Sequence, residues 1–193
     1  MPRLVLATRN AHKAEEFEEL LRPWTVEPLP GAVDLPPETG TTFAENALGK
    51  ARAAAAATGR ASFGDDSGIA AEALDGAPGV RSARFAGEDA TDAENLALFV
   101  ERVPVGSAVA YVCAIAYVDP ATGTEHLVEG RCTGTVAPEP RGDGGFGYDP
   151  IFLPDDVEVA RGRTMAELAP HEKAAISHRG AAARALLDAL RAG

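Results

Sequence analysis

The sequence predicts an α/β fold built around a mixed β-sheet. Three observations lead to this prediction: a strand followed at once by a helix at the start, a β-rich region at 107–136, and a helical C-terminus. Strands and helices do not alternate regularly along the chain, so a mixed sheet is favoured over a doubly wound parallel one. The whole chain, 1–193, is predicted to form a single domain.

Apolar periodicity and capping signals define the elements of the N-terminal part. In chain order we expect a strand, a helix, a strand and a helix over 3–7, 11–21, 24–29 and 42–57. Asn10 is a suitable N-cap for the first helix. Thr42 and Glu45 have the spacing of a capping box for the second, and Gly59 follows its end.

The C-terminal part is predicted in the same way. We expect two short strands at 62–64 and 69–73, a loop at 75–87, and a helix at 91–103 that Thr91 and Glu94 open. Two long strands follow at 107–118 and 125–136, then an irregular segment at 137–154 and a last helix at 172–191. Residues 119–123 read as the turn of a hairpin. The apolar side of the helix that Thr91 opens consists of Leu96, Phe99, Val100 and Val103.

Composition and charge exclude several classes of partner. The 193 residues are 46% hydrophobic and 24% charged, with no apolar window of about 18 residues, so no membrane span is expected. The net charge of −11 disfavours nucleic acid and anionic lipid. Cys113 and Cys132 lie in apolar runs and are predicted to be buried free thiols, with a bridge between them as the alternative. With no secretory signal at Met1, the protein is expected to be cytoplasmic.

The stretch FGDDSG, residues 63–68, places two carboxylates side by side after a predicted strand. One interpretation is a surface turn, since Asp, Ser and Gly are turn residues. The other is a metal or acid–base site. In an extended chain Asp65 and Asp66 would point in different directions, so that one faces a metal while the other orients a neighbouring group.

The segment 8–13 joins the first strand to the first helix. A helix N-terminus favours anions and disfavours the cations Arg9 and Lys13, a penalty that a bound phosphate chain would remove. Solvated basic side chains are the alternative. Lysine is otherwise scarce: Lys13, Lys50 and Lys173 are the only three, which makes each a candidate for a specific role.

Further carboxylates stand near this region. Glu38, Asp65 and Asp66 are hard oxygen ligands of the kind that suits Mg²⁺ sharing the phosphates of a substrate. Glu45 is a further candidate ligand, and its capping box is the alternative explanation. No Walker loop or zinc-ligand spacing is present in the sequence.

Two segments near the C-terminus combine polar and aromatic residues. Glycines in 142–150 would let a ligand approach the backbone closely, and Phe146 or Tyr148 could stack on a planar base; a hairpin loop with core aromatics is the alternative. Lys173, Ser177 and His178 share a helical neighbourhood at the start of the last helix.

Together these motifs resemble one known family. The stretches T-x-N-x-x-K, FAENA, DDSG, GAPGVRSARFAG, GGFGYDPIF and AEL…EK…ISHR occur in order over nearly the whole chain and are similar to those of the inosine triphosphate pyrophosphatase family. The resemblance implies an elongated mixed sheet flanked by helices, two lobes with a central active-site cleft, and a homodimer. Gly64 stands where the family commonly has Ala, and Arg81 and Phe85 stand where it commonly has Tyr.

The resemblance also implies an activity: Mg²⁺-dependent hydrolysis of ITP, dITP and XTP to the monophosphate and pyrophosphate, which cleanses the nucleotide pool. Asp66 would be the proton acceptor and a metal ligand, with Glu38 as the second ligand and Asp65 in support. His178 and Arg179 would donate to the 6-oxo group of the base. The residues expected to contact substrate are Thr8, Arg9, Asn10, Ala11, His12, Lys13, Ser67, Phe146, Gly147, Tyr148, Asp149, Lys173, His178 and Arg179.

Two alternatives remain open at this point. A related pyrophosphatase acting on pyrimidine nucleotides would share the phosphate and metal residues, but the ISHR motif argues against it. A nucleotide-binding module without turnover would have no use for a base, and the carboxylates Glu38, Asp65 and Asp66 argue against that.

Overall fold

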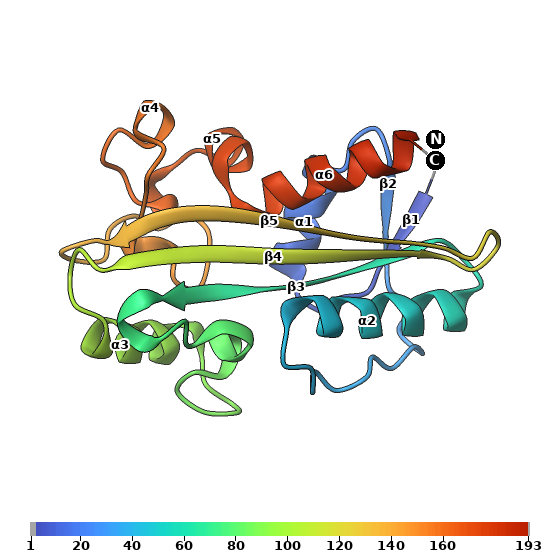
Figure 1. Cartoon of the computed structure of the whole chain (residues 1–193), viewed down its shortest axis with the longest axis horizontal. Coiled ribbons are helices and arrows are strands. Elements are labelled where there is room, and N and C mark those ends of the chain that lie inside the picture. The colour runs from blue at the N-terminus through green and yellow to red at the C-terminus, as the bar shows by residue number, and fades with distance from the viewer. Residues whose placement is uncertain (1–2, 193) are drawn as a thin grey trace. The chain divides into compact units, whose positions relative to one another are not determined.

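In the computed structural model, which describes residues 3–192, six strands form one sheet in the order β2-β1-β3-β4-β5-β6 (Figure 1). β1 pairs in parallel with β2 and with β3, whereas β6 pairs antiparallel with β5, which confirms the predicted mixed sheet. The strands are β1 (Arg3–Leu6), β2 (Thr25–Pro28), β3 (Ser62–Ala71), β4 (Ala108–Asp119), β5 (Thr124–Val136) and β6 (Phe152–Pro154).

The helices begin where the sequence places N-caps. Asn10 caps the first helix, Thr42 and Thr91 each form a capping box, and Gly59 ends the second helix with a φ of 65°. Within residues 3–192, no helix is both long and apolar enough to cross a bilayer. The helices are α1 (Ala11–Leu20), α2 (Phe43–Thr58), α3 (Asp92–Arg102), α4 (Val157–Ala160), α5 (Pro170–Ile176) and α6 (His178–Ala192).

The chain divides into two compact units. Unit 1 consists of residues 3–66, 113–130 and 179–192 of the described chain, and unit 2 of residues 67–112 and 131–178. The division falls at the peptide bonds Asp66–Ser67 and His178–Arg179, inside two of the motifs that the sequence singles out.

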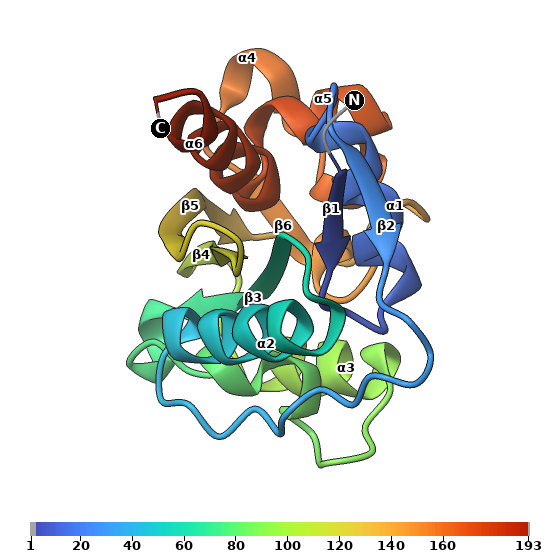
Figure 2. The same ribbon diagram turned by 90° about the vertical axis from the view of Figure 1, so that its right-hand side faces the viewer.

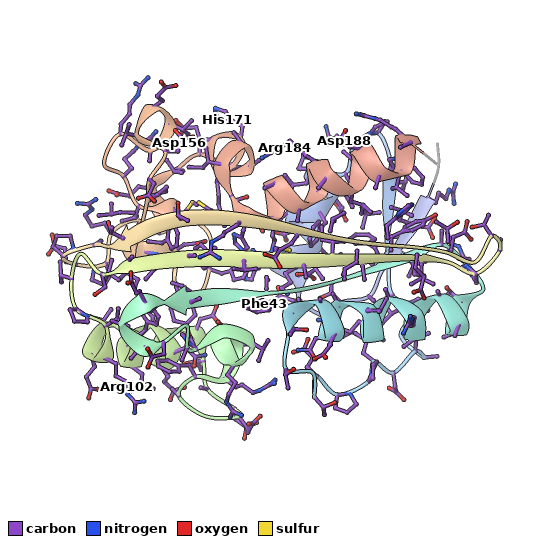
Figure 3. All side chains as sticks on the ribbon, viewed as in Figure 1. Phe43, Arg102, Asp156, His171, Arg184 and Asp188 are labelled. Carbon is purple, nitrogen blue, oxygen red and sulfur yellow. The ribbon has the colours of Figure 1, made fainter. Side chains whose placement is uncertain are left out.

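The core of unit 1 is organised by the alternation of β4. Cys113, Ile115 and Tyr117 face a cluster that includes residues of α1 and α6, whereas Ala114 and Ala116 face α2. This is the period of two expected of a strand buried on both faces. In this unit α2 therefore covers one face of the sheet and α6 the other (Figure 2). Arg184 and Asp188 lie on the outward side of α6 (Figure 3).

The core of unit 2 forms one apolar cluster. Ile69 of β3, Phe99 of α3 and Phe152 of β6 are fully buried in it, together with Met165. Of the apolar face predicted for α3, Phe99 and Val103 are buried but Val100 is 42% exposed, so the prediction is wrong for Val100.

Four predicted elements differ in the structure. The predicted irregular segment 137–154 contains a 3₁₀ turn at Asp149–Ile151 and the strand β6. The acidic pair does not separate two short strands, because β3 runs unbroken through it; hydrogen bonding to its neighbours in the sheet, β1 and β4, outweighs the local turn preference of Asp, Ser and Gly. The predicted loop 75–87 contains a 3₁₀ turn at Gly79–Arg84. The last helix is two helices, because Ser177 adopts an extended conformation with ψ of 156° between α5 and α6.

Candidate active site

The two adjacent carboxylates of β3 point to different helices. Nζ of Lys13, on α1, lies 2.7 Å from Oδ2 of Asp65. Nδ2 of Asn46, on α2, donates to Oδ2 of Asp66 at 2.8 Å. Consecutive residues of a strand face opposite sides of the sheet, so the predicted divergence of the pair is confirmed.

The surroundings of the two carboxylates separate their acidities. Burial opposes ionisation of Asp65, but the charges of Lys13, Lys50 and Arg179 outweigh it, so the pKa of Asp65 is lowered. Burial raises the pKa of Asp66, and the charge of Lys50 and the Asn46 hydrogen bond offset this only in part. One carboxylate is thus a fixed anion, and its neighbour is a better proton acceptor than an ordinary aspartate.

Lys50 is the shared cation of this cluster. Its ammonium group pairs with Oε1 of Glu38, and its side chain is 8% exposed. Burial alone would lower the pKa of Lys50, but the charges of Asp65, Glu38 and Asp66 outweigh burial and raise it. Lys50 therefore stays charged. The sequence marked Lys50 only as one of three scarce lysines; its position one helical turn after Asn46 on α2 was the available signal.

Asn46 is a residue that the sequence analysis missed. Its side chain donates to Asp66, and its Oδ1 accepts from the backbone N–H of Gly40 at 2.8 Å. A Cβ on Gly40 would lie 2.6 Å from that oxygen, so glycine is needed for the approach. Asn46 therefore fixes Asp66 relative to the loop that carries Glu38. The FAENA motif contains it, but its capping residue Glu45 accounted for the motif at the level of sequence.

The predicted phosphate loop is ordered by its own side chains. Oδ1 of Asn10 accepts from the backbone N–H of Lys13 at 3.1 Å, and Oγ1 of Thr8 accepts from the N–H of Asn10 at 3.2 Å. Asn10, Ala11 and His12 are exposed at the start of α1.

Arg9 has a different environment from the one expected. Its guanidinium group donates to the carbonyl oxygens of Leu29 at 2.9 Å, Pro30 at 2.9 Å and Val33 at 2.7 Å. These donors hold the loop after β2 in place, which gives Arg9 a structural role; its contact with phosphate stays a prediction.

Arg179 is also held by protein groups. Its side chain is 7% exposed, and NH1 pairs with Oε2 of Glu16 on α1 at 2.9 Å. Its charge contributes to the lowered pKa of Asp65. In unit 1 Arg179 thus links α6 to α1 and to the carboxylate cluster.

In unit 2, Asp149 is the centre of the polar contacts. Its Oδ1 accepts from the Tyr111 hydroxyl at 3.0 Å, and its Oδ2 accepts from the Phe146 N–H at 3.0 Å and from Nζ of Lys173 at 2.8 Å. The same ammonium group lies 5.3 Å from the centre of the half-buried Phe146 ring. The structure thereby brings together Phe146, Asp149 and Lys173, which the sequence predicted as separate contacts.

Tyr148 does not present its ring as predicted. It is 6% exposed, its hydroxyl donates to the Ser82 carbonyl at 2.7 Å, and its ring packs 5.1 Å from that of Phe99. Of the two aromatic candidates for stacking on a base, Tyr148 therefore belongs to the core. Its neighbour Gly147 donates its N–H to Asp92 at 3.1 Å, a contact not foreseen from the sequence.

His178 and Ser67 are the remaining predicted residues of unit 2. His178 is 3% exposed and its ring stacks on Tyr111 at 4.5 Å and 16°. Ser67 is partly buried in β3 directly after Asp66.

Three glycines of the segment 142–147 lie close to other atoms of unit 2. A Cβ on Gly142 would lie 2.5 Å from the carbonyl carbon of Ala166, and one on Gly144 would lie 2.8 Å from the Ala166 oxygen. A Cβ on Gly145 would meet Oδ2 of Asp149 at 2.0 Å. Glycine at 142 and 144 lets the loop approach the Ala166 backbone closely, and glycine at 145 leaves room for the Asp149 carboxylate.

The donor set of unit 1 fits a magnesium ion that shares its coordination with a substrate. Glu38 and Asp66 flank the same ammonium group of Lys50, and the charge of Glu38 contributes to the raised pKa of Asp66. Among residues 3–192 no group of three or more His, Cys, Asp or Glu side chains forms a metal cage. Two carboxylates completed by phosphate and water are the usual Mg²⁺ arrangement.

Comparison with known proteins connects this geometry with one family. The Ham1 family model matches residues 4–189. The chain is 48% identical over 201 residues to the dITP/XTP pyrophosphatase of Mycolicibacterium paratuberculosis, covering 98% of this chain and 96% of that protein. It is 47% identical over 201 residues to the dITP/XTP pyrophosphatase of Shigella flexneri, covering 100% of both.

Solved structures agree with this assignment. A HAM1 protein from Coxiella burnetii superposes with a TM-score of 0.85 at 41% identity, covering 100% of both chains. The Staphylococcus aureus Ham1 protein gives a TM-score of 0.82 at 33% identity, covering 98% of both. The sequence resemblance is therefore confirmed, and the chain belongs to the Ham1 family.

Proposed function

We propose that this protein hydrolyses ITP, dITP and XTP to the nucleoside monophosphate and pyrophosphate in a Mg²⁺-dependent reaction, removing deaminated purines from the nucleotide pool. The observation that carries the proposal is the carboxylate pair of β3, in which Lys13 and its neighbours keep Asp65 ionised while burial raises the pKa of Asp66. The names of the relatives, dITP/XTP pyrophosphatases, supply the substrate class.

Asp66 is the proton acceptor in this mechanism. Water attacks the α-phosphorus and loses its proton to the carboxylate, whose raised pKa matches the task of a general base better than that of an exposed aspartate. Asn46 holds the acceptor oxygen through its 2.8 Å hydrogen bond. Mg²⁺ bound by Glu38 and Asp66 would supply charge neutralisation for the triphosphate and the leaving pyrophosphate.

The triphosphate is assigned to cations and to a helix terminus. In unit 1, Lys13 and the start of α1, where Asn10, Ala11 and His12 are exposed, bind phosphate oxygens. In unit 2, Ser67 and Lys173 are the donors assigned to phosphate. Lys13 also pairs with Asp65, so a bound phosphate would share the ammonium group with this carboxylate.

The base is assigned to Phe146 and His178. The half-buried Phe146 ring is available for stacking on a planar base, and a donor from His178 would meet a 6-oxo acceptor but not the 6-amino group of adenine. An unpaired buried polar group costs about 1–3 kcal/mol, which corresponds to roughly ten- to hundredfold discrimination per contact.

A homodimer in the cytoplasm is the proposed state of the protein. Cys113 and Cys132 are both buried and unbridged, as predicted, and burial raises the pKa of Cys132 to about 12, so neither thiol is activated. Such thiols suit a reducing compartment.

Sedimentation equilibrium at several protein concentrations tests the dimer, and a monomer mass throughout would refute it.

The function is tested by measuring pyrophosphate release with Mg²⁺ from ITP, dITP, XTP, ATP, GTP and dTTP, with and without a chelator. We expect release from the first three to exceed that from the others by at least tenfold and to stop with the chelator. Release from dTTP at a similar rate would favour the pyrimidine-directed alternative. Binding of ITP without pyrophosphate release would favour the binding module.

A further inference from the structure

Tyr111 occupies the middle of a stack of three aromatic rings in unit 2. The Phe152 ring lies 4.4 Å from the Tyr111 ring with an interplanar angle of 16°, and the His178 ring lies 4.5 Å from it, also at 16°. Two near-parallel rings at this spacing do not fit on one face of a six-membered ring, so Tyr111 separates them. Because Phe152 is 0% exposed in the apolar cluster, the stack connects His178 to the core.

The hydroxyl group of the same residue holds one oxygen of Asp149. It donates to Oδ1 at 3.0 Å, while Oδ2 accepts from Lys173 and from the Phe146 N–H. Asp149 is 3% exposed and Tyr111 is 6% exposed. A carboxylate held at only one oxygen can turn about its Cβ–Cγ bond, so the Tyr111 hydroxyl fixes the plane in which Asp149 presents its second oxygen.

We propose that Tyr111 is a positioning residue with two separable effects on the nucleotide. Through Asp149 its hydroxyl places the Lys173 ammonium group and the Phe146 backbone, and so sets nucleotide affinity. Through the stack its ring places the His178 imidazole, and so sets the choice of base. The assignment rests on the proposed function, because Lys173, Phe146 and His178 are substrate contacts only if the protein binds nucleotides.

A purely structural role for Tyr111 makes a different prediction. Tyr111 belongs to the apolar cluster of unit 2, and a core residue of that kind would affect folding and every substrate equally. A loss of core packing does not explain why removing the hydroxyl would change only nucleotide affinity. Nor does it explain why removing the ring would affect ITP and ATP unequally.

Two variants remove the two parts of the side chain. Tyr111→Phe keeps the ring stack and loses the hydroxyl; we expect KM for ITP to rise about tenfold, kcat to change less than about twofold, and the ITP-to-ATP ratio of kcat/KM to stay as in the parent protein. Tyr111→Leu also removes the ring under His178, and we expect the same ratio to fall at least fivefold, roughly half the discrimination of one polar contact.

Tyr117→Phe is the matched control. Tyr117 lies on the same strand, β4, is also 6% exposed and also stacks on a histidine, with its ring 5.7 Å from that of His126 in unit 1. This variant is expected to leave KM and the substrate ratio unchanged. If Tyr111→Leu does not fold, Tyr111→Met takes its place, because the unbranched, flexible Met side chain adapts to an irregular space.

Equal effects of all three variants on ITP and ATP, in proportion to their loss of Tm, would overturn the proposal in favour of packing alone. An unchanged KM in Tyr111→Phe would remove the role of the hydroxyl, and an unchanged ratio in Tyr111→Leu would remove that of the ring. ITP affinity is measured in parallel by calorimetry. If the parent protein binds ITP without hydrolysing it, the proposed function fails, and the same comparisons are made on Kd.

Discussion

The predicted site residues of unit 1 are held by ion pairs, whereas those of unit 2 are held by stacked rings and by hydrogen bonds to one carboxylate. Lys13 pairs with Asp65, and Arg179 with Glu16, in unit 1. In unit 2 the single ion pair of this kind, among the described site residues, is Lys173 with Asp149, beside the Tyr111–His178 stack. Charges at close range suit phosphate chemistry and proton transfer, whereas flat surfaces and single donors suit the reading of a base.

The largest effect is expected from Asp66→Asn, which removes the proposed proton acceptor from the charged residues of unit 1. We expect kcat to fall roughly a thousandfold because general base catalysis contributes about 10²–10⁴. Affinity for the nucleotide measured without Mg²⁺ should change little, since Lys13 and the start of α1 remain. Steady-state kinetics and calorimetry measure the two quantities. Asp188→Asn on the outward side of α6 is the control, and near-parental turnover in Asp66→Asn would remove Asp66 as the base.

The Lys13–Asp65 pair tests whether charge in unit 1 serves stability or substrate. Lys13→Met leaves a fully buried carboxylate without its 2.7 Å partner, and the free energy of unfolding should fall by about 3 kcal/mol. Adding Asp65→Asn removes the uncompensated charge and should restore most of that loss, as measured by urea denaturation.

The same double variant separates the two roles of Lys13. If Lys13 binds phosphate, KM for ITP stays high in the double variant although stability returns. Recovery of both would show that the lysine acts only on Asp65. Arg22→Met breaks an exposed pair with Glu19 and should cost less than about 0.5 kcal/mol.

Gly64→Ala tests how closely α2 must approach the carboxylates. A Cβ at Gly64 would lie 2.7 Å from the Ala47 oxygen and 2.9 Å from the Ala51 nitrogen, both backbone atoms of α2. We expect a loss of about 1–3 kcal/mol and a lower kcat, because the helix that carries Asn46 and Lys50 must move. Gly31→Ala, where a Cβ meets nothing within 4 Å, is the control. Unchanged stability in Gly64→Ala would show that α2 adjusts freely.

The smallest effect is expected in unit 2, at the helix that carries Lys173. Arg163 makes two hydrogen bonds to Glu172, at 3.0 and 2.7 Å, and these lower the pKa of Glu172 from 4.5 to about 2. A lowered pKa means that the stabilisation is complete above about pH 4.5 and is lost as the pH falls toward 2.

Thermal unfolding of the parent protein and of Glu172→Gln between pH 6 and pH 2 measures this contribution. The two Tm values should differ most at about pH 6 and converge on acidification. Glu158→Gln, at an exposed position of α4, is the control. A difference that is constant over the whole range would show that the Arg163 pair is not responsible.

Local signals in the sequence predicted much of this arrangement. The caps at Asn10, Thr42 and Thr91 and the divergence of Asp65 from Asp66 depend on neighbouring residues alone, and the structure has all of them. The continuity of β3 through the acidic pair was not predicted, because it depends on hydrogen bonding to neighbouring strands that are remote in the chain.

The missed residues share that dependence on distant partners. A tyrosine such as Tyr111 in an apolar strand is expected to be a core residue. Its sequence neighbours give no indication that its hydroxyl donates to Asp149, 38 residues away. Asn46 was concealed differently, because its motif already had an explanation in the Glu45 capping box. The structural contacts of Arg9 were not predicted either, because the carbonyl groups that it binds lie at least 20 residues further on.

The alanine run of α2 shows how the polar contacts of unit 1 are possible. Ala47, Ala51 and Ala55 are at most 1% exposed and pack on Ala114 and Ala116 of β4, so the helix backbone lies close to the sheet. A side chain as short as that of asparagine can then reach Asp66. For protein engineering, the alanines of α2 are thus among the least replaceable residues, although the run looks unspecific in the sequence. In a library that varies them freely, variants would lose catalysis before they lose solubility.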